Sequence, residues 1–234
     1  MAFHPVKCNV LSITNNRNII HYPYKLHGGQ LEHVTKAKYL GVTVQSNLKW
    51  DSHISNICNK ANSTLGFLKR NLKISSTTLK QQAYTTLVRP SIEYACSVWD
   101  PYTQVDKDKL EMVQRRAARF VTNRFRNRSS VGDMLEGLGW YSLESRRRDI
   151  RLATLYQIIH DKVYIRKDRL IPPNRLSRNM HLQSFQVPSC RTQTYKHTFF
   201  PRTIVHWNSL PPAVATSDPL SSFKSSLSNT HTNN

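Results

Sequence analysis

An expected helix over residues 105–126 carries arginines on one side, and more follow in the segment after it. These arginines are Arg115, Arg116, Arg119, Arg124, Arg126 and Arg128. No acidic residue lies between Glu111 and Asp133. Guanidinium groups in such a row bind phosphate oxygens by charge and by hydrogen bonds, so the pattern predicts a helix lying along a nucleic-acid backbone. The alternative is a solvated face whose cations offset the helix dipole.

Two further groups of cations extend this expectation. Lys69 and Arg70 end another expected helix and join the candidate nucleic-acid contacts. A second patch lies in residues 144–151, and its arginines are Arg146, Arg147, Arg148 and Arg151. Because Glu144 and Asp149 dilute this patch, phosphate binding and a solvated face are equally good interpretations of it,.

The composition indicates the same kind of partner. The 234 residues include 34 Lys and Arg against 14 Asp and Glu, which gives a formal net charge of +20. Self-repulsion of this size opposes a compact state unless a polyanion shares the charge. Nucleic acid is therefore the expected partner, rather than a membrane surface or charge that serves solubility alone.

The residue patterns that carry enzyme chemistry are missing from the sequence. It contains no Asp-Asp pair for two-metal phosphoryl transfer, no phosphate-binding G-x-x-x-x-G-K-[ST] loop and no G-x-S-x-G elbow,. The four cysteines are scattered, and the histidines lack the i, i+4 spacing of a helical zinc site,. We therefore predict no catalytic residues, no metal site, no cofactor and no small-molecule substrate.

The first 50 residues alternate short β-like runs with turns. The runs cover residues 6–13, 19–25 and 30–44, and residues 14–16 and 27–29 supply turn chemistry. Such a pattern predicts an antiparallel meander or a set of hairpins.

From about residue 52 the apolar residues recur at helical spacing. The first stripe is Ile54, Ile57, Cys58, Ala61, Leu65 and Leu68, and the second is Leu79, Ala83, Tyr84, Leu87 and Val88. Pro90 is expected to end the second helix. Further helices are expected over residues 92–99, 105–126, 131–138 and 143–160. Helices joined by short connections predict a bundle.

Prolines interrupt every apolar run beyond about residue 165, which predicts an irregular, basic extension. Residues 199–211 hold too many large apolar side chains for a solvated linker, so we expect them to pack back on the helices. Asp218 and Pro219 are placed to begin a last helix. The predicted fold is α+β and mainly α, divided into residues 1–50, 51–165 and 166–234, with a frayed end.

A series of sequence blocks follows one order along nearly the whole chain. The blocks are residues 3–8, 39–41 with 48–50 and 53–54, 65–70, 87–95 with 98–101, 110–120, 143–147 and 199–211. Together they resemble the C-terminal third of reverse transcriptases encoded by non-LTR, LINE-type, jockey-like retrotransposons. The resemblance implies the end of a polymerase palm, a helical thumb and a C-terminal extension.

This resemblance assigns expected roles to particular residues. Tyr39, Leu40 and Gly41 would form the primer-grip loop that positions a primer end, and Lys7 would match a palm lysine that assists the departing pyrophosphate. The family's aromatic-x-Asp-Asp hairpin is not in this sequence. The resemblance therefore implies a non-catalytic fragment that retains at most sequence-tolerant binding of RNA or an RNA–DNA hybrid.

Other functions stay open at this point. The chain could be a bundle that docks another protein, or a non-functional relic of a transposable element. A nuclease would need an ordered set of Asp and Glu on strands, which the sequence does not show. Without a signal-like start or an apolar run of membrane length, we expect an intracellular chain, nuclear or cytoplasmic, of undetermined oligomeric state.

Overall fold

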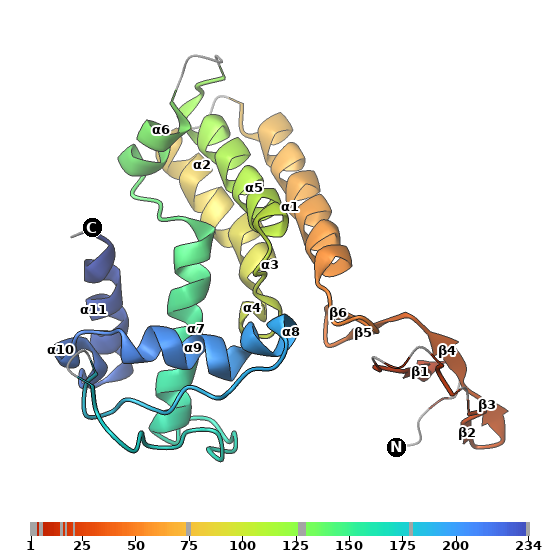
Figure 1. Ribbon diagram of the computed structural model, residues 1–234. Coiled ribbons are helices and arrows are strands. Elements are labelled where there is room, and N and C mark those ends of the chain that lie inside the picture. The colour runs from red at the N-terminus through yellow and green to blue at the C-terminus, as the bar shows by residue number, and fades with distance from the viewer. Residues whose placement is uncertain are drawn as a thin grey trace. The chain divides into compact units, whose positions relative to one another are not determined.

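The computed structural model divides the chain into two compact units, residues 1–60 and 61–234 (Figure 1). We call them the β unit and the helical unit. The structure describes residues 4, 7–14, 16, 18–20, 22–73, 76–125, 130–177 and 180–232. Helices dominate the described residues, which confirms the α+β, mainly α class. The expected boundaries at residues 50 and 165 stay a prediction.

Short strands pair two by two in the β unit. They are β1 (Asn9–Leu11), β2 (Lys25–Leu26), β3 (Gly29–Gln30), β4 (Glu32–Val34), β5 (Lys36–Tyr39) and β6 (Val42–Gln45). β2 pairs with β3 and β5 with β6 as antiparallel hairpins, whereas β1 and β4 run parallel. The β1–β4 pair differs from the expected meander because residues 12–31 are long enough to bring the chain back to the same end before β4 starts.

The long helix α1 (Asp51–Asn71) follows the stripe that the sequence predicted. Its buried residues are Ile54, Cys58, Ala61, Leu65 and Leu68, and Ile57 is half-buried. Steps of three and four keep these side chains on one face of a helix. The opposite face is left to polar and charged residues and to the exposed Phe67.

The second helical stretch does not stop at Pro90. α2 (Thr77–Ala83) passes into a π-helical turn, η2 (Tyr84–Val88), and then into α3 (Arg89–Glu93) and α4 (Cys96–Trp99). The Arg89 N–H bonds to the Tyr84 carbonyl, five residues back, and Pro90 then lies in the first turn of α3. Pro is tolerated there because a first-turn N–H has no partner within its helix.

The succession of α2, η2 and α3 also corrects the apolar stripe that was predicted for the second helix. Leu79 and Leu87 were expected inside, but both are exposed. Tyr84 and Val88 are buried as predicted, and Lys80 and Ile92 complete the buried face in place of the two leucines. The Lys80 ammonium is accommodated because it donates to Asn123 Oδ1 at 2.8 Å and lies 5.4 Å from the centre of the Phe120 ring,.

The next three helices begin and end close to their expected positions. They are α5 (Gln104–Thr122), α6 (Val131–Gly137) and α7 (Leu143–Ile159). The α5 residues Leu110, Val113, Ala117, Phe120 and Val121 are buried, as the sequence predicted. Ser142 Oγ caps α7 by accepting the Ser145 N–H at 3.0 Å, and Ser130 Oγ caps α6 in the same way,.

The C-terminal segment is more helical than expected. It contains α8 (Gln193–Lys196), α9 (Phe199–Asn208), α10 (Pro212–Ala215) and α11 (Leu220–Thr232). The prolines start these helices rather than break them, because Pro201 and Pro212 lie in first turns and Pro219 directly precedes α11,. The described residues between α7 and α8 have the irregular backbone that the prolines suggested.

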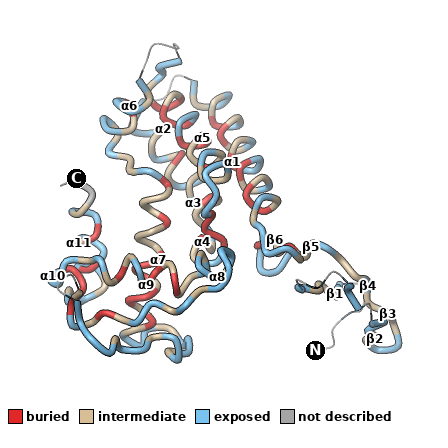
Figure 2. Tube along the Cα trace, in the orientation of Figure 1, coloured by how far each residue is buried: buried red, intermediate tan, exposed pale blue. Residues whose placement is uncertain are grey.

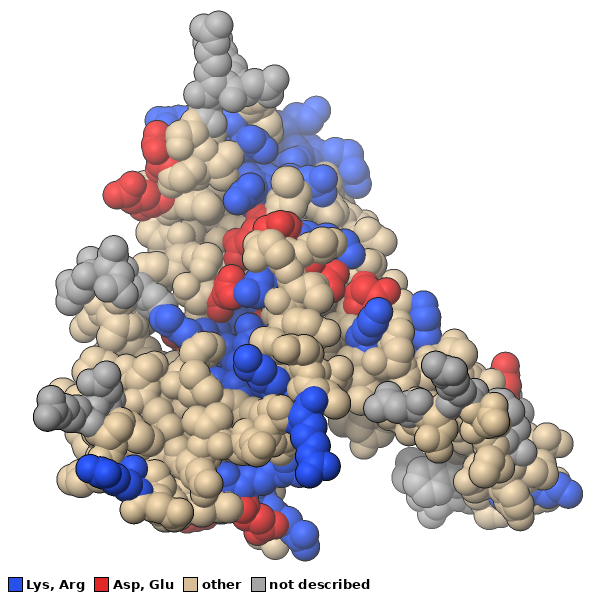
Figure 3. Space-filling model, viewed as in Figure 1, with Lys and Arg blue, Asp and Glu red and all other residues tan. Residues whose placement is uncertain are grey.

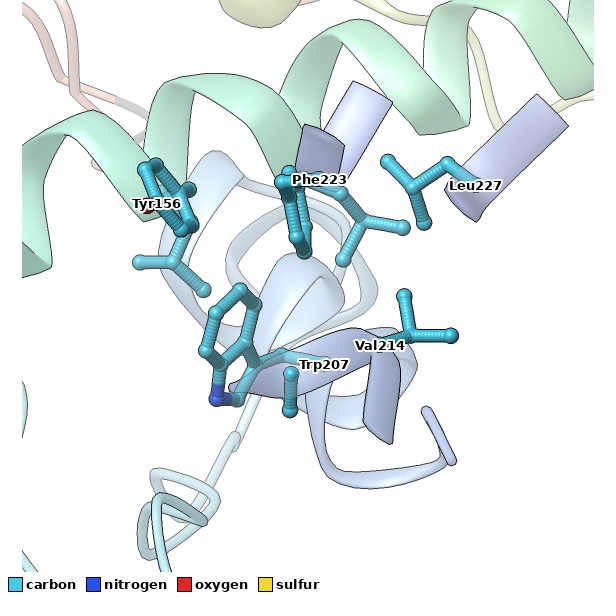
Figure 4. Packing of buried hydrophobic residues seen from close by; sticks show 8 residues of the cluster. Tyr156, Trp207, Val214, Phe223 and Leu227 are labelled. Atoms are coloured by element: carbon cyan, nitrogen blue, oxygen red, sulfur yellow. The ribbon is translucent and has the colours of Figure 1, made fainter. Parts of the chain in front are cut away.

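An apolar core joins this segment to α7. Its buried members are Leu152, Leu155, Tyr156, Trp207, Val214, Ala215, Phe223 and Leu227 (Figure 4). The Tyr156 and Phe223 rings stack with centroids 4.7 Å apart, and the Trp207 indole N–H donates to the Gln183 carbonyl at 2.8 Å. The expected packing of residues 199–211 on the helices is thus found around Trp207.

Buried residues, red in Figure 2, recur along α1, α2, α5 and α9. Each helix therefore has an inner, apolar face and an outer face that remains available for contacts. Within the described ranges, no helix is long and apolar enough to cross a membrane.

Candidate nucleic-acid interface

Six cations lie on the outer face of α1 and α5 and just beyond α5. We call Lys69, Arg70, Arg115, Arg116, Arg119 and Arg124 the basic helical surface. Lys69 and Arg119 are half-buried, and the other four are exposed. Figure 3 shows Lys and Arg gathered over this end of α1 and α5. The structure therefore brings together, on neighbouring helices, cations that lie far apart in the sequence.

The two helices meet directly through polar side chains. Arg116 Nη1 donates to Asn62 Oδ1 on α1 at 3.1 Å. Burial, and then the charge of Arg116, lower the pKa of Lys69. Burial is the larger cause, and repulsion between the positive charges of Lys69 and Arg116 adds to it,. An anion bound between them would relieve that repulsion.

Acidic residues are sparse around this surface. The sequence has none between Asp51 and Glu93, and none between Glu111 and Asp133. Glu111, one turn before Arg115, accepts the Glu144 N–H at 3.0 Å, and burial raises its pKa. Glu111 is thus engaged by the start of α7, and no acidic residue follows it on α5.

Arg126 and Arg128, the last two arginines of the predicted row, lie outside the described residues. Arg124 is the last described member of that row. It follows the helix end, where Asn123 adopts a left-handed backbone with φ of 54°. Its N–H bonds to the Arg119 carbonyl at 3.2 Å, so the end of α5 fixes its backbone.

The second predicted patch has a different role. Arg146 binds Glu93 through two nitrogens, Nε to Oε1 and Nη2 to Oε2, the latter at 3.1 Å. Arg147 has no exposed surface and pairs with Asp100 at 2.7 Å. The prediction that Arg147 contacts nucleic acid is therefore wrong, because its guanidinium is enclosed. Arg146 is partly exposed, but its charge is matched by Glu93.

Asp100 is the centre of a buried ionic cluster that the sequence did not reveal. Arg147, Arg151 and Arg202 approach its carboxylate at 2.7, 3.0 and 3.1 Å, and we call these four residues the Asp100 cluster. Arg202 also donates to the carbonyls of Asp100 and Pro101. The cluster ties α9 to α7 and to the end of α4, with three positive charges around one negative charge.

The electrostatics of the Asp100 cluster follow from this imbalance. Burial, only partly offset by the Asp100 charge, lowers the pKa of Arg151 to about 10. His206, 3.4 Å from Arg151, has its pKa lowered to about 4 by burial and by the nearby arginines. His206 is therefore neutral at pH 7 and adds no fourth positive charge.

The candidate grip residues form the tip of the β5–β6 hairpin. Tyr39 faces Val42 in the register, and Leu40 and Gly41 are the two loop residues. Their φ angles are 45° and 85°, which is the positive-φ pair of a type I′ hairpin turn,. Tyr39 and Leu40 are 71% and 73% exposed, so the hairpin presents two large side chains to solvent.

The first turn of α1 holds this hairpin in place. The Thr43 N–H donates to His53 Nδ1 at 3.2 Å, and the Ser52 N–H donates to Gln45 Oε1 at 3.1 Å. Burial lowers the pKa of His53, so the imidazole is neutral at pH 7 and can accept at Nδ1,. Sequence reasoning identified the strand–turn–helix junction but gave no role to His53.

Lys7 lies two residues before the start of β1, and its N–H donates to the His4 carbonyl at 3.0 Å. It is exposed. The structure therefore places Lys7 and the hairpin tip in the β unit, and the basic helical surface in the helical unit. Among the described residues, no group of three or more His, Cys, Asp or Glu could hold a metal ion.

The left-handed backbone at Leu40 leads to a testable prediction. A bulky residue at positive φ costs about 1 kcal/mol, and Asn-Gly is the favoured pair in a type I′ turn. We expect Leu40→Asn to slow hydrogen exchange at the amides that pair β5 with β6 by about fivefold. Gly41→Ala, which adds a Cβ at φ of 85°, should speed the same exchange,. Unchanged or faster exchange in Leu40→Asn would mean that the Leu40 side chain itself stabilises the tip.

The fold and the site together define a mainly helical α+β protein, with a type I′ hairpin at the start of a long helix and a basic surface on two helices. No protein-family model matches the chain, and no solved structure matches it.

One curated protein is similar in sequence. It is the probable RNA-directed DNA polymerase from transposon X-element of Drosophila melanogaster, 24% identical over 161 residues. The match covers 61% of this chain and 16% of the relative. The chain thus spans a small part of the relative's length. This similarity supports a region related to retrotransposon reverse transcriptases within the chain.

Proposed function

We propose that this chain is the C-terminal part of a non-LTR retrotransposon reverse transcriptase. The similarity to the X-element polymerase and the ordered sequence blocks support this proposal. On this view the β5–β6 hairpin is the primer-grip loop at the end of a palm, and α1 to α7 are the thumb. The helices from α8 onward are the C-terminal extension.

The retained activity is binding of RNA or an RNA–DNA hybrid through phosphate contacts. The observation that carries this proposal is the basic helical surface itself, where Arg116 of α5 reaches Asn62 of α1 and the sequence has no acidic residue from 52 to 92 or from 112 to 132. Cations held in that way bind a polyanion by releasing its counterions, which does not depend on base sequence. Sequence-tolerant binding follows.

Polymerisation is not part of the proposal. The sequence has no Asp-Asp pair for the two metal ions that polymerases use,. The purified chain with Mg²⁺, primer–template and nucleotides should therefore incorporate nothing. Incorporation above a no-protein control would contradict the non-catalytic assignment while leaving the binding proposal intact.

A second candidate function has its own supporting observation. Leu87 on η2, Tyr94 just after α3 and Val98 on α4 are 56%, 58% and 60% exposed. Exposed large apolar side chains close together in the sequence are a feature of surfaces that dock another protein. Apolar docking depends little on salt, so ionic strength separates this candidate from nucleic-acid binding.

Salt titration of nucleic-acid binding is the direct test of the proposed function. With about six phosphates neutralised, log affinity for a hybrid duplex should fall with log salt at a slope near −5. Between 50 and 200 mM salt the affinity should fall by about a thousandfold, which fluorescence anisotropy with a labelled RNA–DNA hybrid can measure. No binding in very dilute buffer, or a slope near zero, would refute the proposal.

A further inference from the structure

Two exposed phenylalanines lie within the basic helical surface. Phe67 on α1 is 56% exposed, and Phe125, which follows Arg124, is 59% exposed. Phe67 precedes Arg70 by three residues, so the two side chains share the outer face of α1. Both rings thus lie beside the cations that the proposed function assigns to phosphate.

Packing among the described residues does not account for these rings. The buried stripe of α1 contains Ala61, Leu65 and Leu68, and Phe67 lies off that stripe. Phe125 follows the end of α5, beyond its last buried residue, Val121. Single exposed apolar residues are common, but Phe67 lies near the C-terminal end of α1 and Phe125 just beyond that of α5,. These two helix ends lie at the same end of the helical unit (Figure 1), among cations with few acids nearby.

We propose that Phe67 and Phe125 stack on unpaired bases, so that the basic helical surface prefers single-stranded RNA, or the single-stranded extension of a hybrid, to blunt duplex. This inference rests on the proposed function and adds the class of ligand. Phosphate contacts hold either form, because both expose a charged backbone. Stacking distinguishes the two forms, since a duplex hides base faces everywhere except at its ends.

The expected size of the effect follows from measured stacking. A base stacked on an aromatic side chain strengthens binding by about 5- to 150-fold. Loss of two such contacts should therefore weaken single-strand binding by about 30-fold or more. Duplex binding should change by less than about threefold, because its phosphate contacts remain.

The test uses the full chain with two ligands, an unstructured RNA of about 20 nucleotides and a blunt RNA duplex of the same length. The variants are Phe67→Ala with Phe125→Ala, and Phe67→Tyr with Phe125→Tyr, which keeps both rings. The control is Tyr164→Ala with Leu182→Ala, which removes two other exposed apolar side chains of the helical unit. We expect the Ala pair alone to lose single-strand affinity.

The outcomes separate the two proposals. If the wild-type chain binds neither ligand in dilute buffer, the proposed function fails and this inference fails with it. If it binds both with a steep salt dependence but the Ala pair matches the wild type, only this inference fails. The inference would also be overturned if the Ala pair lost the same affinity for both ligands, because stacking requires an unpaired base. Equal losses of affinity in the Tyr and Ala pairs would overturn it as well, because stacking requires only the aromatic ring.

Discussion

The Asp100→Asn variant should unfold at a markedly lower urea concentration than the wild type, with a loss of about 3–5 kcal/mol in the free energy of unfolding. Three guanidinium groups surround the Asp100 carboxylate, and the side chains of Arg147 and Arg151 are only 0% and 2% exposed. Removing the negative charge leaves these cations buried and mutually repelling. Tryptophan fluorescence should report the change, because Trp99 and Trp207 are fully buried in the helical unit.

A matched exposed pair provides the control for this prediction. Lys107 and Glu144 form an ion pair at 2.5 Å, with the Glu144 side chain 46% exposed. Solvent screens such a pair, so Glu144→Gln should cost less than about 1 kcal/mol. A loss in Asp100→Asn as small as that in Glu144→Gln would show that the Asp100 cluster does not hold the helices together.

A second substitution tests whether excess charge is the cause. In the Asp100→Asn background, Arg151→Met removes one of the stranded cations and keeps an apolar side chain of similar length. Because buried ion pairs can often be replaced by well-packed apolar groups, the double variant should recover part of the lost stability. Additive destabilisation would instead indicate that Arg151 acts mainly through its packing.

The helices could be predicted from the sequence because their periodicity is local. The stripe of α1 and the buried face of α5 were recognised from residues three and four apart, and the structure buries them as expected,. The serines that cap α6 and α7 are equally local signals,. The exposure of most cations of the basic helical surface could be predicted from the same periodicity, since residues opposite a buried stripe face solvent.

The errors came from interactions between distant residues. Lys80 was not expected inside, yet Asn123, which lies on another element, accepts from its ammonium. Arg147 was expected outside, yet its partner Asp100 lies 47 residues earlier in the chain. A charged side chain that finds a buried partner overrides its usual preference for solvent, and no periodic pattern in one helix shows that partner.

Proline was the other source of error. Sequence reasoning treated Pro90 and the prolines of the C-terminal segment other than Pro219 as breaks, but the effect of a proline depends on its position within a helix. Pro90 follows the π-helical turn, and Pro201 lies in the first turn of α9, where the missing N–H costs nothing,. The C-terminal segment could therefore become helical and contribute Trp207 and Phe223 to the core.

The largest effect on binding should come from reversing charges on α5. Arg115→Glu, Arg116→Glu and Arg119→Glu together replace three of the six cations of the basic helical surface with acids. We expect affinity for an RNA–DNA hybrid at about 50 mM salt to fall by roughly 10²–10³-fold. The slope of log affinity against log salt should become shallower by about 3, because three fewer counterions are released.

The control variant changes the net charge by the same amount in a different segment of the chain. Arg166→Glu, Arg175→Glu and Arg191→Glu alter three exposed arginines of the segment between α7 and α8. Both triple variants shift the net charge by the same amount, but charges farther away than about 10 Å are screened at 0.1 M salt. The control should therefore lose less than about fivefold in affinity and keep its slope. Equal losses in the two variants would show that total charge drives binding, and the row of arginines on α5 would then be a solvated helix face.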